Sequence, residues 1–261
     1  MKKIILSIAI ATLTAWSVNA QQTATDGFLR TTSGWEFELR AGVNFIGGTA
    51  PMDMPVEIRS IDGYKPKYSG TFEGVATKWF GEEYGKPEWG ISSGLSIQNR
   101  GMSTKSTVKN YHTIVSMDNS EIEGYWTGKV DTDYSSTLLS IPLLANYRFN
   151  NNWKVRGGLY LGYQLENKFS GSVYDGYLRH MTPTGQKMSI DEGQRSYYDF
   201  SKEMQRWQWG ARIGGSWRAY KHFHVNADLN WGFTPLFKKD FNTITFKMYP
   251  IYLQAGFGYQ F

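Results

Sequence analysis

The chain has 261 residues, of which 16% are aromatic and 20% charged, with 28 glycines and no cysteine. At 41% hydrophobic residues and a mean hydropathy of −0.45, it has too little apolar sequence for a bundle of membrane helices, each of which needs about 20 consecutive apolar residues. Without cysteine, disulfides, thiolate metal sites and thiol nucleophiles are excluded. The net charge of +5 gives no reason to expect nucleic-acid binding.

The first twenty residues are typical of an export signal. Lys2 and Lys3 precede an apolar stretch that ends in Val18-Asn19-Ala20, a small-residue cleavage site. We expect residues 1–20 to be removed, 21–33 to form a short periplasmic segment and 34–261 to form the folded domain. A single anchor helix is the alternative, but the stretch is short and contains Ser and Thr.

Eight segments of the remaining chain predict β-strands. In residues 35–45 the odd positions are apolar and the even positions are mostly polar, so the two sets lie on opposite faces of a strand. The pattern recurs in residues 71–80, 88–98, 139–149, 153–166, 206–217, 223–233 and 249–261. In residues 71–80 the apolar face is either that of Phe72, Ala76 and Phe80 or one switched by a bulge.

The connections between these segments alternate in length. Residues 81–86, 150–152 and 219–221 are short, whereas 46–68, 101–133, 167–202 and 234–243 are long. Outer-membrane barrels have short periplasmic turns and long extracellular loops. The sequence therefore predicts an all-β fold, an eight-stranded antiparallel transmembrane β-barrel. Ten strands remain an alternative, and residues 111–117 with 121–130 are either a hairpin that extends two strands or a solvated loop.

Aromatic residues mark both ends of the predicted strands, at the spacing that a tilted strand needs to cross lipid. We expect the periplasmic belt to include Trp35, Trp89, Phe149, Trp153, Trp217, Phe223 and Phe261. Phe45, Tyr163, Trp207, Trp209, Trp231, Phe233 and Tyr249 mark the opposite ends. A soluble barrel with aromatic-rich ends is the alternative. The final strand, ending at Phe261, is of the kind recognised by the outer-membrane assembly machinery.

The order of these segments, with the strings IPLLANYRF (Ile141–Phe149), WKVRGGLYLGY (Trp153–Tyr163) and GFGYQF at the end, resembles the small outer-membrane β-barrel proteins of the Bacteroidota, often called PorT-like. The resemblance implies an eight-stranded barrel of the porin-like kind in the outer membrane of a Gram-negative bacterium. It implies little about activity, since this family has diverse roles.

Charged residues of both signs fall on the inward faces of the predicted strands. They predict a polar network in the lumen of Glu36, Glu38, Arg40, Glu88, Arg148, Arg156, Arg206, Arg212 and Asp228, to which Arg100, Lys154 and Glu166 also belong. An eight-stranded barrel is just wide enough for side chains to fill it. A closed, ion-paired interior is favoured, and a narrow porin-like channel for ions or small solutes is the alternative.

Catalysis is the third alternative, because some barrels of this size modify lipid A. His224 faces inward near Ser216, but a hydrogen-bonded lumen residue is the favoured interpretation, and His222-x-His224 has no evident third metal ligand. We expect no enzyme activity and no cofactor.

The long loops are where an external function is expected. Aromatic and cationic residues suited to polysaccharide, lipopolysaccharide phosphate or a protein occur at Tyr177, Arg179, Arg195, Tyr197 and Tyr198. The sequence predicts a monomeric structural or surface-interaction protein that contacts outer-membrane lipid, lipopolysaccharide and an unidentified external ligand.

Overall fold

The computed structural model describes residues 34–51, 55–80, 88–117, 120–190 and 193–261. Within them the chain forms one antiparallel sheet of eleven strands and a single-turn 3-10 helix, η2 (Ser201–Glu203). The strands are β1 (Trp35–Pro51), β2 (Ile58–Pro66), β3 (Ser69–Trp79), β4 (Glu88–Met117), β5 (Ser120–Arg148), β6 (Trp153–His180), β7 (Lys187–Ser189), β8 (Ser196–Asp199), β9 (Trp207–Tyr220), β10 (Phe223–Gly232) and β11 (Met248–Gln260). The expected signal peptide and the segment 21–33 lie outside the described residues.

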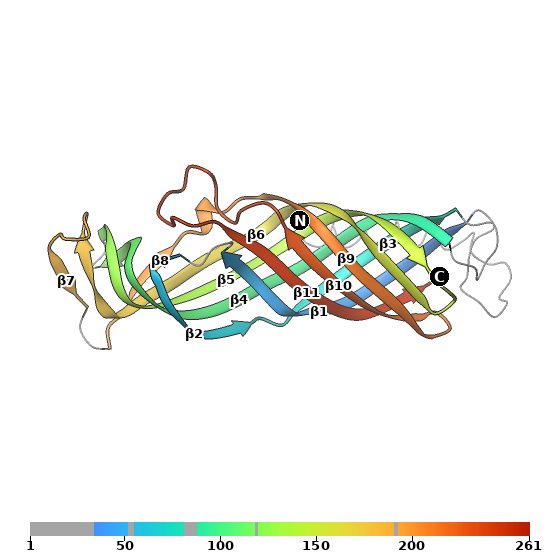
Figure 1. The fold of residues 1–261 in the computed structure, drawn as a ribbon, viewed down its shortest axis with the longest axis horizontal. Helices are drawn as coiled ribbons and strands as arrows, with labels where there is room; N and C mark the ends of the chain where they lie inside the picture. Colours follow the sequence, from blue (N-terminus) through green and yellow to red (C-terminus); the bar gives the residue numbers. More distant parts are fainter. Residues whose placement is uncertain (1–33, 52–54, 81–87, 118–119, 191–192) are drawn as a thin grey trace, which may run out of the picture.

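The strands pair in the order β2-β4-β3-β1-β11-β10-β9-β6-β5, and β4 also pairs with β5. The molecule is elongated, with β4, β5 and β6 running along its length and β7 at the end opposite Phe261 (Figure 1). No helix in the described part of the chain is long and apolar enough to cross a membrane.

The sequence predicted eight strands, and the structure has three more. β2, β7 and β8 lie in the predicted loops 46–68 and 167–202, where short polar segments give no long alternating pattern. They become strands because they pair with the edges of longer ones: β2 with β4, β7 with β6, and β8 with β6 and, at one position, β4. Their existence therefore depends on tertiary pairing.

Strands β4, β5 and β6 extend far beyond their predicted spans. β4, β5 and β6 have 30, 29 and 28 residues, whereas a tilted strand crosses lipid in about 9–11 residues. β4 and β5 stay paired as far as Met117 and Ser120, so the hairpin alternative for residues 111–130 is confirmed and the solvated-loop alternative is wrong.

One part of the molecule is apolar outside and mainly polar inside. We call it the banded segment, and it comprises residues 35–46, 70–80, 88–98, 138–149, 153–165, 207–220, 223–233 and 249–261. Ile91, Leu143 and Leu159 are about half exposed, whereas Ser92 and Arg156 on the opposite face are buried. In β3, Phe72 is exposed and Glu73 buried with no register shift, so the first of the two expected faces is the one found. A shift between Asn44 and Ile46 ends the predicted alternation of β1.

The rest of β4, β5 and β6, together with β2, β7, β8 and residues 234–248, forms what we call the extension. Its interior is apolar: Val115, Trp126, Val173 and Leu178 are fully buried. Leu236 and other residues before β11 pack into the same core. Strands that continue past the band thus form a hydrophobic core in the extension.

Candidate functional site

The interior of the banded segment is held by buried ion pairs. Glu36 accepts hydrogen bonds from Lys154 Nζ at 2.7 Å and Trp79 Nε1 at 3.0 Å, and it pairs with Arg148. Arg148 also donates to Glu88 at 2.8 Å, and its guanidinium lies 4.0 Å from the Trp79 ring centroid. Five strands, β1, β3, β4, β5 and β6, are thereby joined across the interior.

A second set of buried ion pairs lies beside the first and is formed by three arginines and three carboxylates. Arg156 holds Asp228 through two hydrogen bonds of 2.6 Å, the bidentate geometry that suits a guanidinium and a carboxylate. Arg212 donates to Glu73 at 2.5 Å, and Arg40 joins Glu73 to Glu38 at 3.5 and 2.9 Å.

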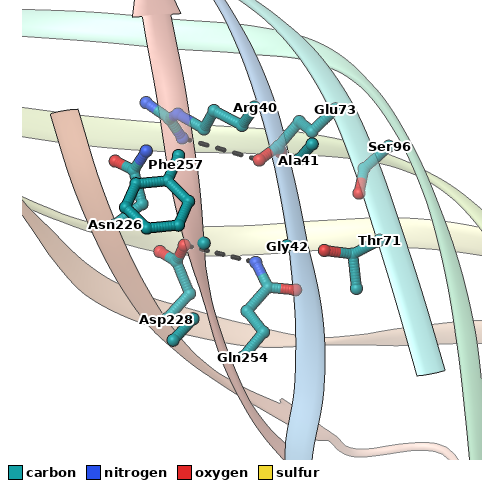
Figure 2. A pocket seen from close by; sticks show the side chains of 12 residues that line it. Arg40, Ala41, Gly42, Thr71, Glu73, Ser96, Asn226, Asp228, Gln254 and Phe257 are labelled. Carbon is teal, nitrogen blue, oxygen red and sulfur yellow. Dashed lines mark hydrogen bonds and ion pairs between the residues drawn. The ribbon is translucent and has the colours of Figure 1, made fainter. Parts of the chain in front are cut away.

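Glycines on neighbouring strands make room for these carboxylates. A Cβ atom on Gly214 would collide with Asp228, and one on Gly258 would collide with Glu38. The cavity that remains between Arg40, Glu73 and Asp228 measures about 20 Å³, room for about one water molecule. Figure 2 shows the Arg40–Glu73 and Gln254–Asp228 contacts on its wall. Side chains therefore fill the interior at this level.

Eight of the nine residues predicted for the lumen are buried in this interior, as is Lys154. Arg100, two residues beyond the band on β4, is buried too and donates to Gln208 at 2.6 Å. Arg206 is the exception and corrects the prediction: it precedes β9, is exposed and donates to the Tyr163 hydroxyl at 3.2 Å. Glu166 is exposed too, just after a register shift in β6. The sequence missed Glu73 because the inward face of its strand could not be chosen from the pattern.

The residues considered for catalysis are part of the same packing. Ser216 Oγ donates to Asn226 and accepts from Arg156, both at 2.5 Å, and His224 Nδ1 lies 3.7 Å from Glu38. Ser216 is thus bonded to Asn226 and Arg156 as part of the packed interior. Among the described residues no three His, Asp or Glu side chains are grouped to hold a metal ion.

The seven predicted belt aromatics are all on the outside of the banded segment. Trp35, Trp89, Phe149, Trp153, Trp217, Phe223 and Phe261 are between 40 and 62% exposed. Trp153 and Trp217 face each other across β6 and β9, with ring centroids 6.2 Å apart. Their contact with a membrane interface stays a prediction.

A larger cavity, of about 620 Å³, lies in the extension and is called here the groove. β2, β4, β5, β6 and β8 each contribute to its lining, through residues such as Lys65, Lys105, Asp131, Ser170 and Tyr197. Its size is that of a typical small-molecule site, about 300–1,000 Å³.

The structure divides the five residues predicted for a loop ligand. Arg195, Tyr197 and Tyr198 line the groove, whereas Tyr177 and Arg179 lie near the distal end of β6. There Lys187 lies 4.3 Å from the Tyr177 ring centroid, and Arg179 donates to the Gly185 carbonyl.

Sequence reasoning missed Lys105, Asp131 and Asp133, because residues 101–133 were expected to be a loop. The signal that could have found them is the alternation of Lys129, Asp131 and Asp133 with Val130 and Tyr134, which are buried.

Strands that carry apolar residues outward and ion-paired residues inward define the class of outer-membrane β-barrel proteins. The chain belongs to the family described as outer membrane protein beta-barrel domain, whose profile matches residues 19–238. Membership in this family indicates the outer membrane of a Gram-negative bacterium. No curated protein sequence matches the chain significantly.

Three solved outer-membrane proteins are similar in fold. They are Ail of Yersinia pestis, crystallised with the heparin analogue sucrose octasulfate (11% identity, TM-score 0.35, covering 87% of this chain and 97% of Ail), OprG of Pseudomonas aeruginosa (15%, 0.36, 91% and 99%) and the protease OmpT of Escherichia coli (12%, 0.33, 88% and 94%).

Proposed function

We propose that this chain is a non-enzymatic surface-binding protein, anchored in the outer membrane by the banded segment and binding its ligand through the extension. The observation that carries the proposal is the contrast between the two cavities: about 20 Å³ in the ion-paired interior and about 620 Å³ in the groove. A filled interior disfavours transport, and a groove on strands outside the band favours binding.

The anchor in this proposal is a closed ring of eight strands. β1, β3, β4, β5, β6, β9, β10 and β11 each pair with two others of the set, including β4 with β5. Closure is expected because lipid offers no partner to an unpaired strand edge. β2, β7 and β8 then lie outside the ring, in the extension.

Several further predictions from the sequence are part of the same proposal. Export by the signal peptide 1–20, a monomeric state, contact with lipopolysaccharide and recognition of β11 by the assembly machinery fit an anchored barrel. Kinship with the PorT-like barrels of the Bacteroidota is supported by the strings at Ile141–Phe149 and Trp153–Tyr163.

Planar-bilayer recording tests the anchor role against the channel alternative. We expect the purified full chain to insert without stable single-channel steps, because Arg148, Lys154 and Arg156 are held by carboxylates across the interior. Stable conductance steps from the unaltered chain would overturn the proposal.

A further inference from the structure

The floor of the groove consists of two rows of polar residues across five strands. In one row, neighbours in the register are Gly63, Lys105, Asp131, Ser172 and Tyr197. In the other they are Lys65, Ser103, Asp133, Ser170 and Asp199. Members of one row lie two residues from those of the other along each strand, so both rows are on the same face of the sheet.

The charges of the groove largely compensate one another. Its lining has four basic residues and three acidic ones. Asp131 accepts from Arg195 at 2.9 Å, and Asp133 accepts from Lys67 at 2.5 Å and from Ser103 at 2.9 Å. A polyanionic ligand would approach three carboxylates, and a polycation would approach four bases. The lining therefore favours a ligand that is polar but carries little charge.

Hydrogen bonds shift the pKa of two charged groups that line the groove, Asp199 and Arg195. A hydrogen bond from Ser201 lowers the pKa of Asp199, and a hydrogen bond to Asp131 raises the pKa of Arg195. Each carboxylate oxygen can accept more than one hydrogen bond, and the Ser and Tyr hydroxyls can both donate and accept. Such a surface matches a ligand that presents several hydroxyl groups.

Tyr197 supplies an aromatic face at one end of its row. It is 62% exposed, whereas the next residue, Tyr198, is buried and bonds to the Thr132 hydroxyl at 2.7 Å. The Tyr198 hydroxyl occupies space that a Cβ atom on Gly171 would need. This contact fixes β8 against β6, so that the exposed ring of Tyr197 borders the groove in a defined position.

We propose that the groove binds a short, uncharged oligosaccharide of about two or three sugar rings, a size compatible with a cavity of this volume. Sugar hydroxyls would bond to Asp131, Asp133 and the serines of the two rows, and the apolar face of one ring would pack on Tyr197. This inference rests on the proposed surface-binding function and names its ligand class.

The test is binding of the full chain, purified in a detergent without a sugar headgroup, to an array of neutral di- and trisaccharides with sulfated counterparts and short neutral peptides. We expect at least one neutral oligosaccharide to bind with a dissociation constant of about 1 mM or tighter by calorimetry. Tyr197→Ala should raise that constant at least about tenfold. Ser170→Trp, which places an indole ring within the groove, should abolish binding.

Tyr177→Ala is the matched control, because Tyr177 is a tyrosine of the same extension outside the groove, and its binding should equal that of the unaltered chain. Heat-modifiable migration on a gel checks that each variant is folded. The proposal is overturned if no neutral oligosaccharide binds, if sulfated sugars or peptides bind more tightly, or if folded Tyr197→Ala and Ser170→Trp bind normally. If a peptide binds and Ser170→Trp blocks it, the oligosaccharide ligand is refuted while the surface-binding function is supported. Stable conductance of the unaltered chain would instead refute the proposed surface-binding function.

Discussion

The banded segment and the extension share β4, β5 and β6, yet their faces are inverted. In the banded segment, Leu143 is outside and Arg148 inside; in the extension, Asp131 is on the groove face and Val130 is buried. The backbone pattern is the same antiparallel pairing throughout. The difference shows that one strand can turn its polar face inward in one part of the molecule and its apolar face inward in another. In the banded segment the apolar side chains are on the outside, and in the extension they pack into a hydrophobic core.

Because their faces are inverted, the banded segment and the extension are stabilised by different interactions. Buried ion pairs must be complete, because a charge left alone in the interior is far more costly than an exposed one. An apolar core depends instead on packing and excluded water. Substitutions that separate these mechanisms test the comparison.

The two largest effects are expected for buried side chains, the first of them for Glu36→Gln in the banded segment. It weakens the contacts of Lys154 and Arg148 in the interior, and breaking a buried pair costs about 3–5 kcal/mol. Urea unfolding of the detergent-solubilised protein, followed by gel mobility, measures the loss. Glu203→Gln is the control, since the exposed Glu203–Lys238 pair should contribute at most about 1 kcal/mol. An equal loss in the free energy of unfolding for both variants would show that the buried ion pairs do not stabilise the banded segment more than an exposed pair does.

In the extension, Trp126→Ala should cost about 3–5 kcal/mol, because the ring is fully buried in the apolar core. The expected result is local: proteases cut the extension while the banded segment keeps its heat-modifiable migration. Trp89→Ala, which removes an exposed ring of the banded segment, should not increase cleavage of the extension. Simultaneous loss of both parts in the Trp126 variant would show that they unfold as one unit.

The boundary between the parts can be located with arginine. Leu143→Arg places a charge in the apolar band and should cost about 2–4 kcal/mol in lipid. Ile61→Arg is matched to it, since Ile61 on β2 is 55% exposed against 61% for Leu143, and it should change stability by less than about 0.5 kcal/mol. Unfolding in vesicles gives both values. A similar cost at Ile61 would put β2 in contact with lipid.

The smallest effect is expected from the tryptophan pair at one end of the band. A double-mutant cycle with Trp153→Leu and Trp217→Leu should give a coupling of about 0.5–1.5 kcal/mol, typical of neighbouring aromatic rings. A coupling of zero would mean that the two rings act independently.

The polar interior was predictable where the chain alternates regularly, whereas the groove was predicted only through Arg195, Tyr197 and Tyr198. Glu36, Glu38, Arg148 and Arg212 could be assigned to the interior because long apolar faces define the opposite side of their strands. Lys105 and Asp133 were missed, since residues 101–133 lack the long outward apolar face of the other strands and were expected to be a loop. Tyr177 and Tyr197 look alike in the sequence, but only Tyr197 borders the groove, because β8 pairs with β6.

By itself, then, the sequence determined that this is a strand-rich protein with an outward apolar face and an inward polar one, since a period of two is a local property of each strand. The tertiary structure decided what depends on contacts between distant segments: the carboxylate that each arginine binds, the length of β4, β5 and β6 beyond the band, and the assembly of five strands into one groove. Register sets these partners, and register follows from how all strands fit together.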